Sequence, residues 1–162
     1  HAAIPAGPQE RSAIDDRTDV LTYTSAPLAT NLHLSGDVIL YLYCSSDSVS
    51  FDLSAVLSEV APNGLTYNLT QGYLTVKSEA IADSSSTPIK LQLQSICVCI
   101  AAGSALRLSL SAACFPAYPV NPGTGESPKQ AQLINQQIIT IMVLSGGNVA
   151  SHLQLPVVSS DV

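Results

Sequence analysis

The sequence of 162 residues is long enough for one domain with a core that needs no covalent support. Only 11% of the residues are charged, against about 25% in typical soluble domains, so uncharged polar and apolar atoms must cover much of the surface. The net charge of −6 and the absence of any basic run argue against a nucleic-acid partner. Large exposed apolar patches usually mark contact surfaces, so a surface with so few charges fits either a Ser/Thr-coated β protein or a domain that has lost its partner, and a homo-oligomer is left open.

Residues 1–18 are interpreted as a linker that follows an upstream domain, and residues 19–162 as a single β-sandwich domain. The start, HAAIPAGPQER, has neither a basic segment nor a long apolar run, so no signal peptide is visible. Within this stretch Asp15 and Asp16 lie beside arginines, a pattern typical of solvated or salt-bridged charges.

Alternation of polar and apolar residues predicts about eight strands. The clearest case is 105–111, where Leu106, Leu108 and Leu110 alternate with an arginine and two serines. In chain order the expected strands are 19–24, 37–44, 51–60, 68–79, 91–100, 105–111, 138–144 and 151–158.

Turn residues between these strands support an all-β fold. Residues 62–64, Pro-Asn-Gly, predict a hairpin turn, and 127–137 is the one region suited to a short helical turn. The nearly continuous apolar run 138–144 predicts a strand covered on both faces, whereas 91–106 alternates and is too short for a membrane span of about 18 residues. We therefore expect a jelly-roll β-sandwich of the galactose-binding-like type, with an immunoglobulin-like sandwich as the alternative.

Four cysteines, Cys44, Cys97, Cys99 and Cys114, are interpreted as buried free thiols. Cys97 and Cys99 are two apart on an expected strand, so they share a face and cannot easily form a disulfide with each other. A single C-x-C pattern is weak evidence for a metal site, so no metal or other cofactor is predicted. Free thiols weakly favour a reducing compartment such as the cytoplasm.

The sequence shows no catalytic motif: the G-x-S-x-G elbow, H-E-x-x-H and the P-loop are all missing. The three histidines, His1, His33 and His152, are interpreted as surface or structural residues. The isolated chain is therefore expected not to be an enzyme. A sugar-binding face would require exposed aromatic rings, but the chain has no Trp, and Tyr41 and Tyr43 are expected to be half-buried sheet residues.

The loop 114–126, CFPAYPVNPGTGE, has three prolines and two glycines within thirteen residues. Because proline fixes φ and removes a backbone donor, these residues end the preceding strand and form a stiff corner. Phe115 and Tyr118 then have apolar area to bury under the loop or against another domain.

Four stretches in order, 6–28, 37–74, 115–126 and 150–158, resemble the C-terminal β domain of one hydrolase family. This family contains the X-Pro dipeptidyl peptidases, cocaine esterase, the α-amino-acid ester hydrolases and the glutaryl acylases. The sequence also departs from the family pattern. It keeps Arg107 but has no histidine just before it, and Cys114 and Ala117 replace a common asparagine and a common basic residue.

The resemblance implies an upstream α/β-hydrolase domain that carries a Ser-His-Asp triad. The β domain would be non-catalytic, would pack on that partner and would help to bound its substrate pocket. The candidate interface residues are Ile4, Gln9, Arg17, Phe115, Tyr118 and Asn121. The alternative is an independent carbohydrate-binding or adhesion module.

Overall fold

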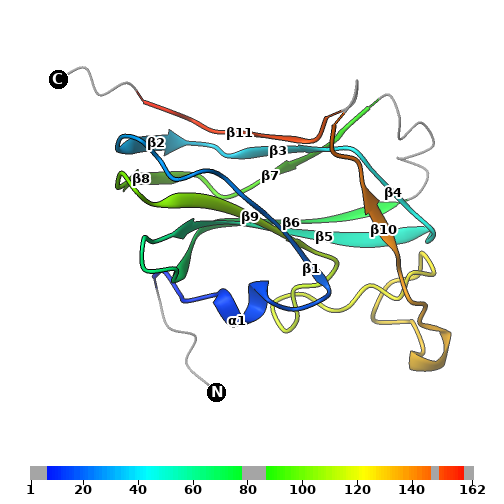
Figure 1. The fold of residues 1–162 in the computed structure, drawn as a ribbon. Helices are drawn as coiled ribbons and strands as arrows, with labels where there is room; N and C mark the ends of the chain where they lie inside the picture. Colours follow the sequence, from blue (N-terminus) through cyan, green and yellow to red (C-terminus); the bar gives the residue numbers. More distant parts are fainter. Residues whose placement is uncertain (1–6, 78–86, 147–149, 159–162) are drawn as a thin grey trace.

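The computed structural model describes residues 7–77, 87–146 and 150–158, and these residues form an all-β sandwich, as expected (Figure 1). Two short helices accompany the strands, α1 (Ser12–Asp15) and the 3-10 helix η2 (Leu133–Asn135). The strands are β1 (Val20–Thr24), β2 (Leu32–Gly36), β3 (Ile39–Leu42), β4 (Cys44–Ser46), β5 (Ser50–Val60), β6 (Thr66–Lys77), β7 (Ile89–Gln92), β8 (Ile96–Ile100), β9 (Ala105–Ser111), β10 (Ile141–Val143) and β11 (His152–Gln154). Neither helix in this described part of the chain is long and apolar enough to cross a membrane.

The strands form two layers. In the first layer four antiparallel strands lie in the order β1-β9-β5-β6. In the opposite layer β11-β3-β7 form a sheet, and the pairs β10-β4 and β2-β8 extend it at its two ends (Figure 1). Neighbours such as β9 and β5 are distant in the sequence, so long connections pass from one layer to the other.

The hairpin β5–β6 contains the two longest strands, and its turn is at the predicted position. Gly64 has φ +86°, a conformation that favours glycine, and its N–H donates to the carbonyl of Ala61 at 2.8 Å. The side chain of Asn63 accepts a hydrogen bond from the N–H of Leu65 at 3.1 Å. The turn chemistry in the sequence therefore predicted this hairpin correctly.

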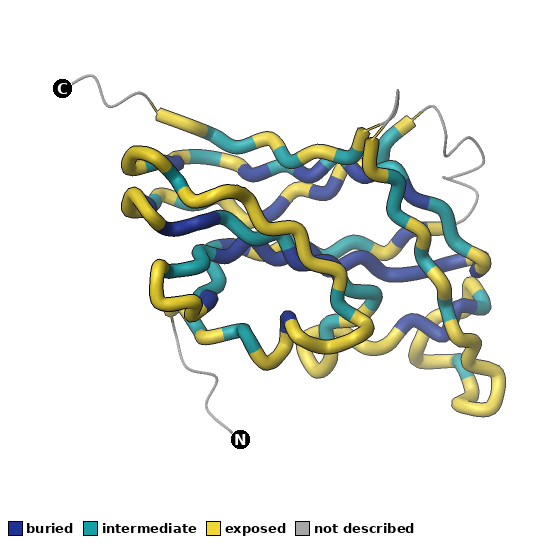
Figure 2. Tube along the Cα trace, in the orientation of Figure 1, coloured by how far each residue is buried: buried dark blue, intermediate teal, exposed yellow. Residues whose placement is uncertain are grey.

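The core lies between the layers, and Figure 2 shows buried residues along the strands with exposed loops around them. Its side chains are mainly leucines, each of which contributes roughly 1.5–3 kcal/mol when fully buried. Gly72 of β6 permits a close approach of the layers, because a Cβ there would lie 2.5 Å from Leu91 Cδ2 and 2.8 Å from the carbonyl oxygen of Gln92. The principal core residues are Val38, Leu40, Leu42, Phe51, Leu53, Ala55, Leu57, Leu91, Leu93 and Leu110.

Two expectations need correction, one about the strand 138–144 and one about the burial of the cysteines. The predicted strand 138–144 is reduced to the three residues of β10, and Ile138 and Met142 are 96% and 61% exposed. The reason is that β10 pairs only with β4, at the end of its layer, so it is not covered on both faces. By contrast, 127–137 contains the expected short helical turn as η2.

The cysteines are free, but only Cys44 is fully buried, and Cys114 is half-buried. Cys97 and Cys99 are exposed, so the interpretation of all four as buried thiols was wrong for these two. The pairing of β8 with β2 turns both side chains to the outer face, while Ile100 on the same strand is directed into the core.

Candidate domain interface

Asp52 is a buried carboxylate on the outer face of the four-stranded sheet, and the proline-rich loop is attached to it. Its side chain accepts hydrogen bonds from Thr75 Oγ1 at 2.8 Å and from Asn121 Nδ2 at 2.9 Å, and a third from the hydroxyl of Tyr73. Asp52 is only 2% exposed, so these donors replace the water that its charge has lost. Burial, and then the hydrogen bond to Asp52, raise the pKa of Tyr73 well above its usual value.

Asn121 connects this carboxylate to the turn of the loop. Its Oδ1 accepts from Ser50 Oγ at 3.0 Å and from the N–H of Gly123 at 2.9 Å. The hydroxyl of Ser50 in turn accepts from the N–H of Gly125 at 3.2 Å. One asparagine side chain therefore satisfies donors from β5 and from the loop itself, which holds the corner rigidly on the sheet.

Two aromatic side chains extend from the fixed loop. Tyr118 stacks on Tyr73, with ring centroids 3.8 Å apart and planes 2° from parallel, and it stays 41% exposed. Phe115 is 75% exposed, so most of its ring faces solvent. A large exposed phenyl ring on a rigid support is typical of a contact residue for another surface.

Residues 9–17 pack beside the loop on the same face. Glu10 makes an antiparallel bridge with Tyr67, and this bridge extends the sheet beyond its edge strand β6. The N–H of Arg11 donates to the carbonyl of Thr66 at 2.8 Å. The expected linker therefore contains a stretch that packs on the sandwich. The boundary at residue 18 stays a prediction.

Helix α1 carries Asp15, whose side chain is almost completely buried against β9. Its carboxylate lies 3.4 Å from Arg11 and 3.7 Å from Arg107, and it accepts a hydrogen bond from Ser109 Oγ at 2.9 Å. Arg107 also donates to Thr24 Oγ1 at 2.9 Å. Arg107 thus connects α1 to β9 and β1.

A cavity of about 490 Å³ separates α1 from the loop. Its floor is the polar outer face of the sheet, and its rim carries the exposed apolar side chains Ile14 and Phe115. Arg17 lies at the same cavity and pairs with Asp19 at 2.6 Å. This arrangement offers a shape and a mixture of apolar and charged groups that a protein surface could fill.

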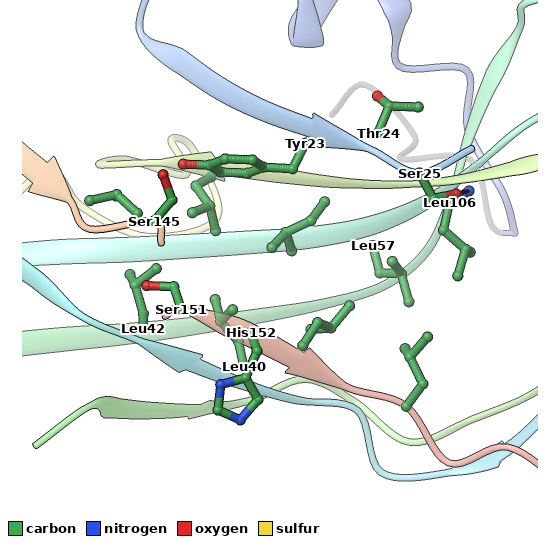
Figure 3. A pocket seen from close by; sticks show the side chains of 15 residues that line it. Tyr23, Thr24, Ser25, Leu40, Leu42, Leu57, Leu106, Ser145, Ser151 and His152 are labelled. Atoms are coloured by element: carbon green, nitrogen blue, oxygen red, sulfur yellow. Dashed lines mark hydrogen bonds between the residues drawn. The ribbon is translucent and has the colours of Figure 1, made fainter. Parts of the chain in front are cut away.

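A second cavity, of about 400 Å³, lies at the edge of the sandwich between β1 and β9 on one side and β3 and β11 on the other (Figure 3). Figure 3 shows Tyr23 and Leu106 on one wall and Leu40, Leu42 and Ser151 on the other. No Asp, Glu, Lys or Arg is among its lining residues in the described part of the chain, and its titratable lining side chains are Tyr23 and His152.

The predicted interface residues fall into four groups. Ile4 lies outside the described residues, and Gln9 and Arg17 lie on the packed N-terminal segment. Phe115 and Tyr118 are exposed on the loop, as an interface requires. Asn121 is only 8% exposed, and its side chain supports the loop from inside.

Sequence reasoning missed Asp52, Tyr73 and the role of Asp15. A charged residue in the middle of an otherwise apolar strand, as in the sequence FDLSAVL, was a signal that Asp52 must have buried partners.

The histidines of the described chain lack the surroundings of a triad. His152 is exposed and stacks on Tyr41, with ring centroids 4.9 Å apart, and His33 lies on β2. Among the hydrogen bonds of the described residues, neither ring bonds to both a serine and a carboxylate, as a triad base does. His1 lies outside the described residues, and no group of three metal-ligating side chains is present within them.

The family model for the X-Pro dipeptidyl-peptidase C-terminal non-catalytic domain matches residues 3–154. The chain belongs to this family. As a member of a non-catalytic family it needs no nucleophile of its own, and the expected resemblance is confirmed.

Cocaine esterase from Rhodococcus sp. (strain MB1 Bresler) is 26% identical over 159 residues, which cover 94% of this chain and 28% of the esterase. Among solved structures, an aminopeptidase from a marine sediment Thaumarchaeota archaeon superposes with a TM-score of 0.80 at 18% identity, over 94% of this chain and 28% of that protein. An α-amino acid ester hydrolase superposes with a TM-score of 0.78 at 22% identity, over 93% of this chain and 27% of that protein. These structures share the fold, and the chain spans little more than a quarter of each relative.

Proposed function

We propose that this family member packs on the catalytic domain of a larger serine hydrolase of the α/β type. The relatives named above are an esterase, an aminopeptidase and an ester hydrolase, and all of these activities cleave an acyl group from oxygen or nitrogen. The proposed parent therefore hydrolyses an ester or amide, while this domain supports the catalytic domain and helps to bound its pocket.

The observation that carries the proposal is Phe115, 75% exposed on a loop that hydrogen bonds fix from below. Burying a phenyl ring is worth roughly 1.5–3 kcal/mol, and the rigid loop means that little conformational entropy is lost when it docks. Ile14, 48% exposed on the other side of the cavity, adds apolar area, and Arg17 adds a charge at its rim.

A titration of this chain with the separately produced catalytic domain tests the proposal. We expect Phe115→Ala to weaken docking about tenfold or more, since about 1.5 kcal/mol or more of buried apolar area is lost. The matched control is Val157→Ala, because Val157 is 60% exposed but lies beside β2 in the opposite layer. Equal affinities for Phe115→Ala and the unmodified chain would refute the proposed docking surface.

A free-standing carbohydrate-binding module is the weaker proposal. Tyr41 and Tyr43 are half-buried, and one face of the Tyr41 ring is taken by His152. The galactose-binding-like subtype of the sandwich stays a prediction.

A further inference from the structure

Strands β2 and β8 place a histidine and a cysteine side by side on an exposed face. The register of the pair sets His33 directly opposite Cys99, and the same register sets Ser35 opposite Cys97. All four side chains belong to exposed residues, while Leu34 and Ile100 of the same strands are buried. The sulfur of Cys99 lies 3.7 Å from Nε2 of His33, which is within hydrogen-bonding distance for a thiol.

This contact distinguishes Cys99 from the other thiols of the chain. The thiolate is the reactive form of cysteine, and a neighbouring imidazole can accept the proton and then stabilise the anion as imidazolium. Cys97 is exposed on the same strand face, but its cross-strand neighbour is a serine, which is not a base. Cys44 is buried, and burial raises its pKa to about 11.

Within residues 7–77, 87–146 and 150–158, the surroundings leave the pair accessible and without a competing charge. The segment that runs beside β2 is uncharged at this point. The N–H of Val158 donates to the carbonyl of His33 at 3.0 Å, and Val157 forms an antiparallel bridge with Leu34. On the side of Cys97 the nearby residues are uncharged, namely Gly7, Pro8, Asn68 and Leu69. The one other titratable group beside Cys99 on its own strand face is therefore Cys97.

We propose that Cys99 and His33 form a reactive thiol site at which small-molecule disulfides attach as mixed disulfides. His33 takes the proton of Cys99, and the thiolate attacks one sulfur of the disulfide RSSR. A new S–S bond forms as the RS–SR bond breaks, and the departing RS⁻ receives the proton from His33. A second small thiol reverses the reaction, so the modification is reversible and requires no other reactant.

The test is disulfide exchange of the native chain with oxidised glutathione, followed by peptide mass spectrometry. In the unmodified chain we expect Cys99 to be labelled on the order of tenfold faster than Cys97, because only Cys99 has an imidazole in contact that can take its proton during the attack. Cys97 is the internal control, since both cysteines are exposed on the same face of β8. Cys99→Ser removes the fast phase, and Cys97→Ser leaves it unchanged.

His33→Gln separates a role in proton transfer from mere proximity. At pH 7 we expect it to slow labelling of Cys99 on the order of tenfold, and above about pH 9.5, where thiols ionise unaided, the two rates should converge. His152→Gln, at the exposed histidine on β11, should change neither rate. Equal labelling of Cys97 and Cys99 in the unmodified chain would overturn the proposal without any substitution. An unchanged rate at pH 7 in His33→Gln would overturn it as well.

Discussion

Replacing Asn121 by alanine removes three hydrogen bonds from beneath the loop at once. The buried carboxylate of Asp52 loses one of its donors, and the hydroxyl of Ser50 and the N–H of Gly123 lose their acceptor. Asp52 keeps the hydroxyls of Tyr73 and Thr75, so it stays partly compensated.

The size of the effect follows from these contacts. A hydrogen bond to a charged group contributes about 1.5–3 kcal/mol and a neutral one about 1 kcal/mol, so the substitution should cost about 4 kcal/mol of unfolding free energy. Ser50 and Asn121 are 4% and 8% exposed, so bulk water does not reach the orphaned groups without movement of the loop. For a domain of this size the loss corresponds to a fall in Tm of roughly 8–16 °C.

Urea unfolding followed by circular dichroism measures this change, with Tm as the second readout. Asn135→Ala is the matched control, because Asn135 is exposed in η2 and the same atoms are removed there. It should change stability by less than about 0.5 kcal/mol. If Asn121→Ala lost no more than Asn135→Ala, the loop would not depend on the hydrogen bonds described here.

Two further predictions concern the same region. The raised pKa of Tyr73 means that the folded state favours the neutral phenol, so this contribution to stability is present below about pH 10 and is lost as the pH rises further. Ultraviolet titration should show one tyrosinate step above the usual range that Tyr73→Phe removes, and a curve without such a step would contradict the buried contact with Asp52. Gly72→Ala should lower the free energy of unfolding by about 1–3 kcal/mol in urea, because the new Cβ would lie 2.5 Å from Leu91 Cδ2. An unfolding free energy equal to that of the unmodified chain would contradict this and would show that β7 can move aside.

The polar face beneath the loop has a physical consequence for the proposed docking. Hydrogen bonds hold the loop in one geometry, which lets Phe115 stay exposed without the corner collapsing onto the core. A preorganised contact residue reduces the entropy lost on association. Stability of the loop and affinity for the partner should therefore respond to different residues, Asn121 for the first and Phe115 for the second.

The alternation of side chains was sufficient to predict the class of fold. The period of two in β5, β8 and β9, and the Pro-Asn-Gly turn at 62–64, depend only on neighbours in the sequence. The ordered stretches that resemble the family were also visible without coordinates. The stiff corner at 114–126 followed from its prolines and glycines.

Other features depended on partners far along the chain. Asn121 meets Asp52 across 69 residues, and Asp15 meets Ser109 across 94 residues, so no local pattern could pair them. The alternation of polar and apolar residues also divides a strand into two faces without showing which face the other layer covers. Cys97 and Cys99 are exposed because of the register between β8 and β2, and β10 is short because it pairs only with β4 at the end of its layer. The sequence by itself determined the all-β class, most of the strand regions, the Pro-Asn-Gly turn and the family, since these depend on local conformation and order. Only the tertiary structure decided which side chains meet and which reach solvent, because cross-strand register and the packing of α1 and the loop on the sheet are set by contacts between distant segments.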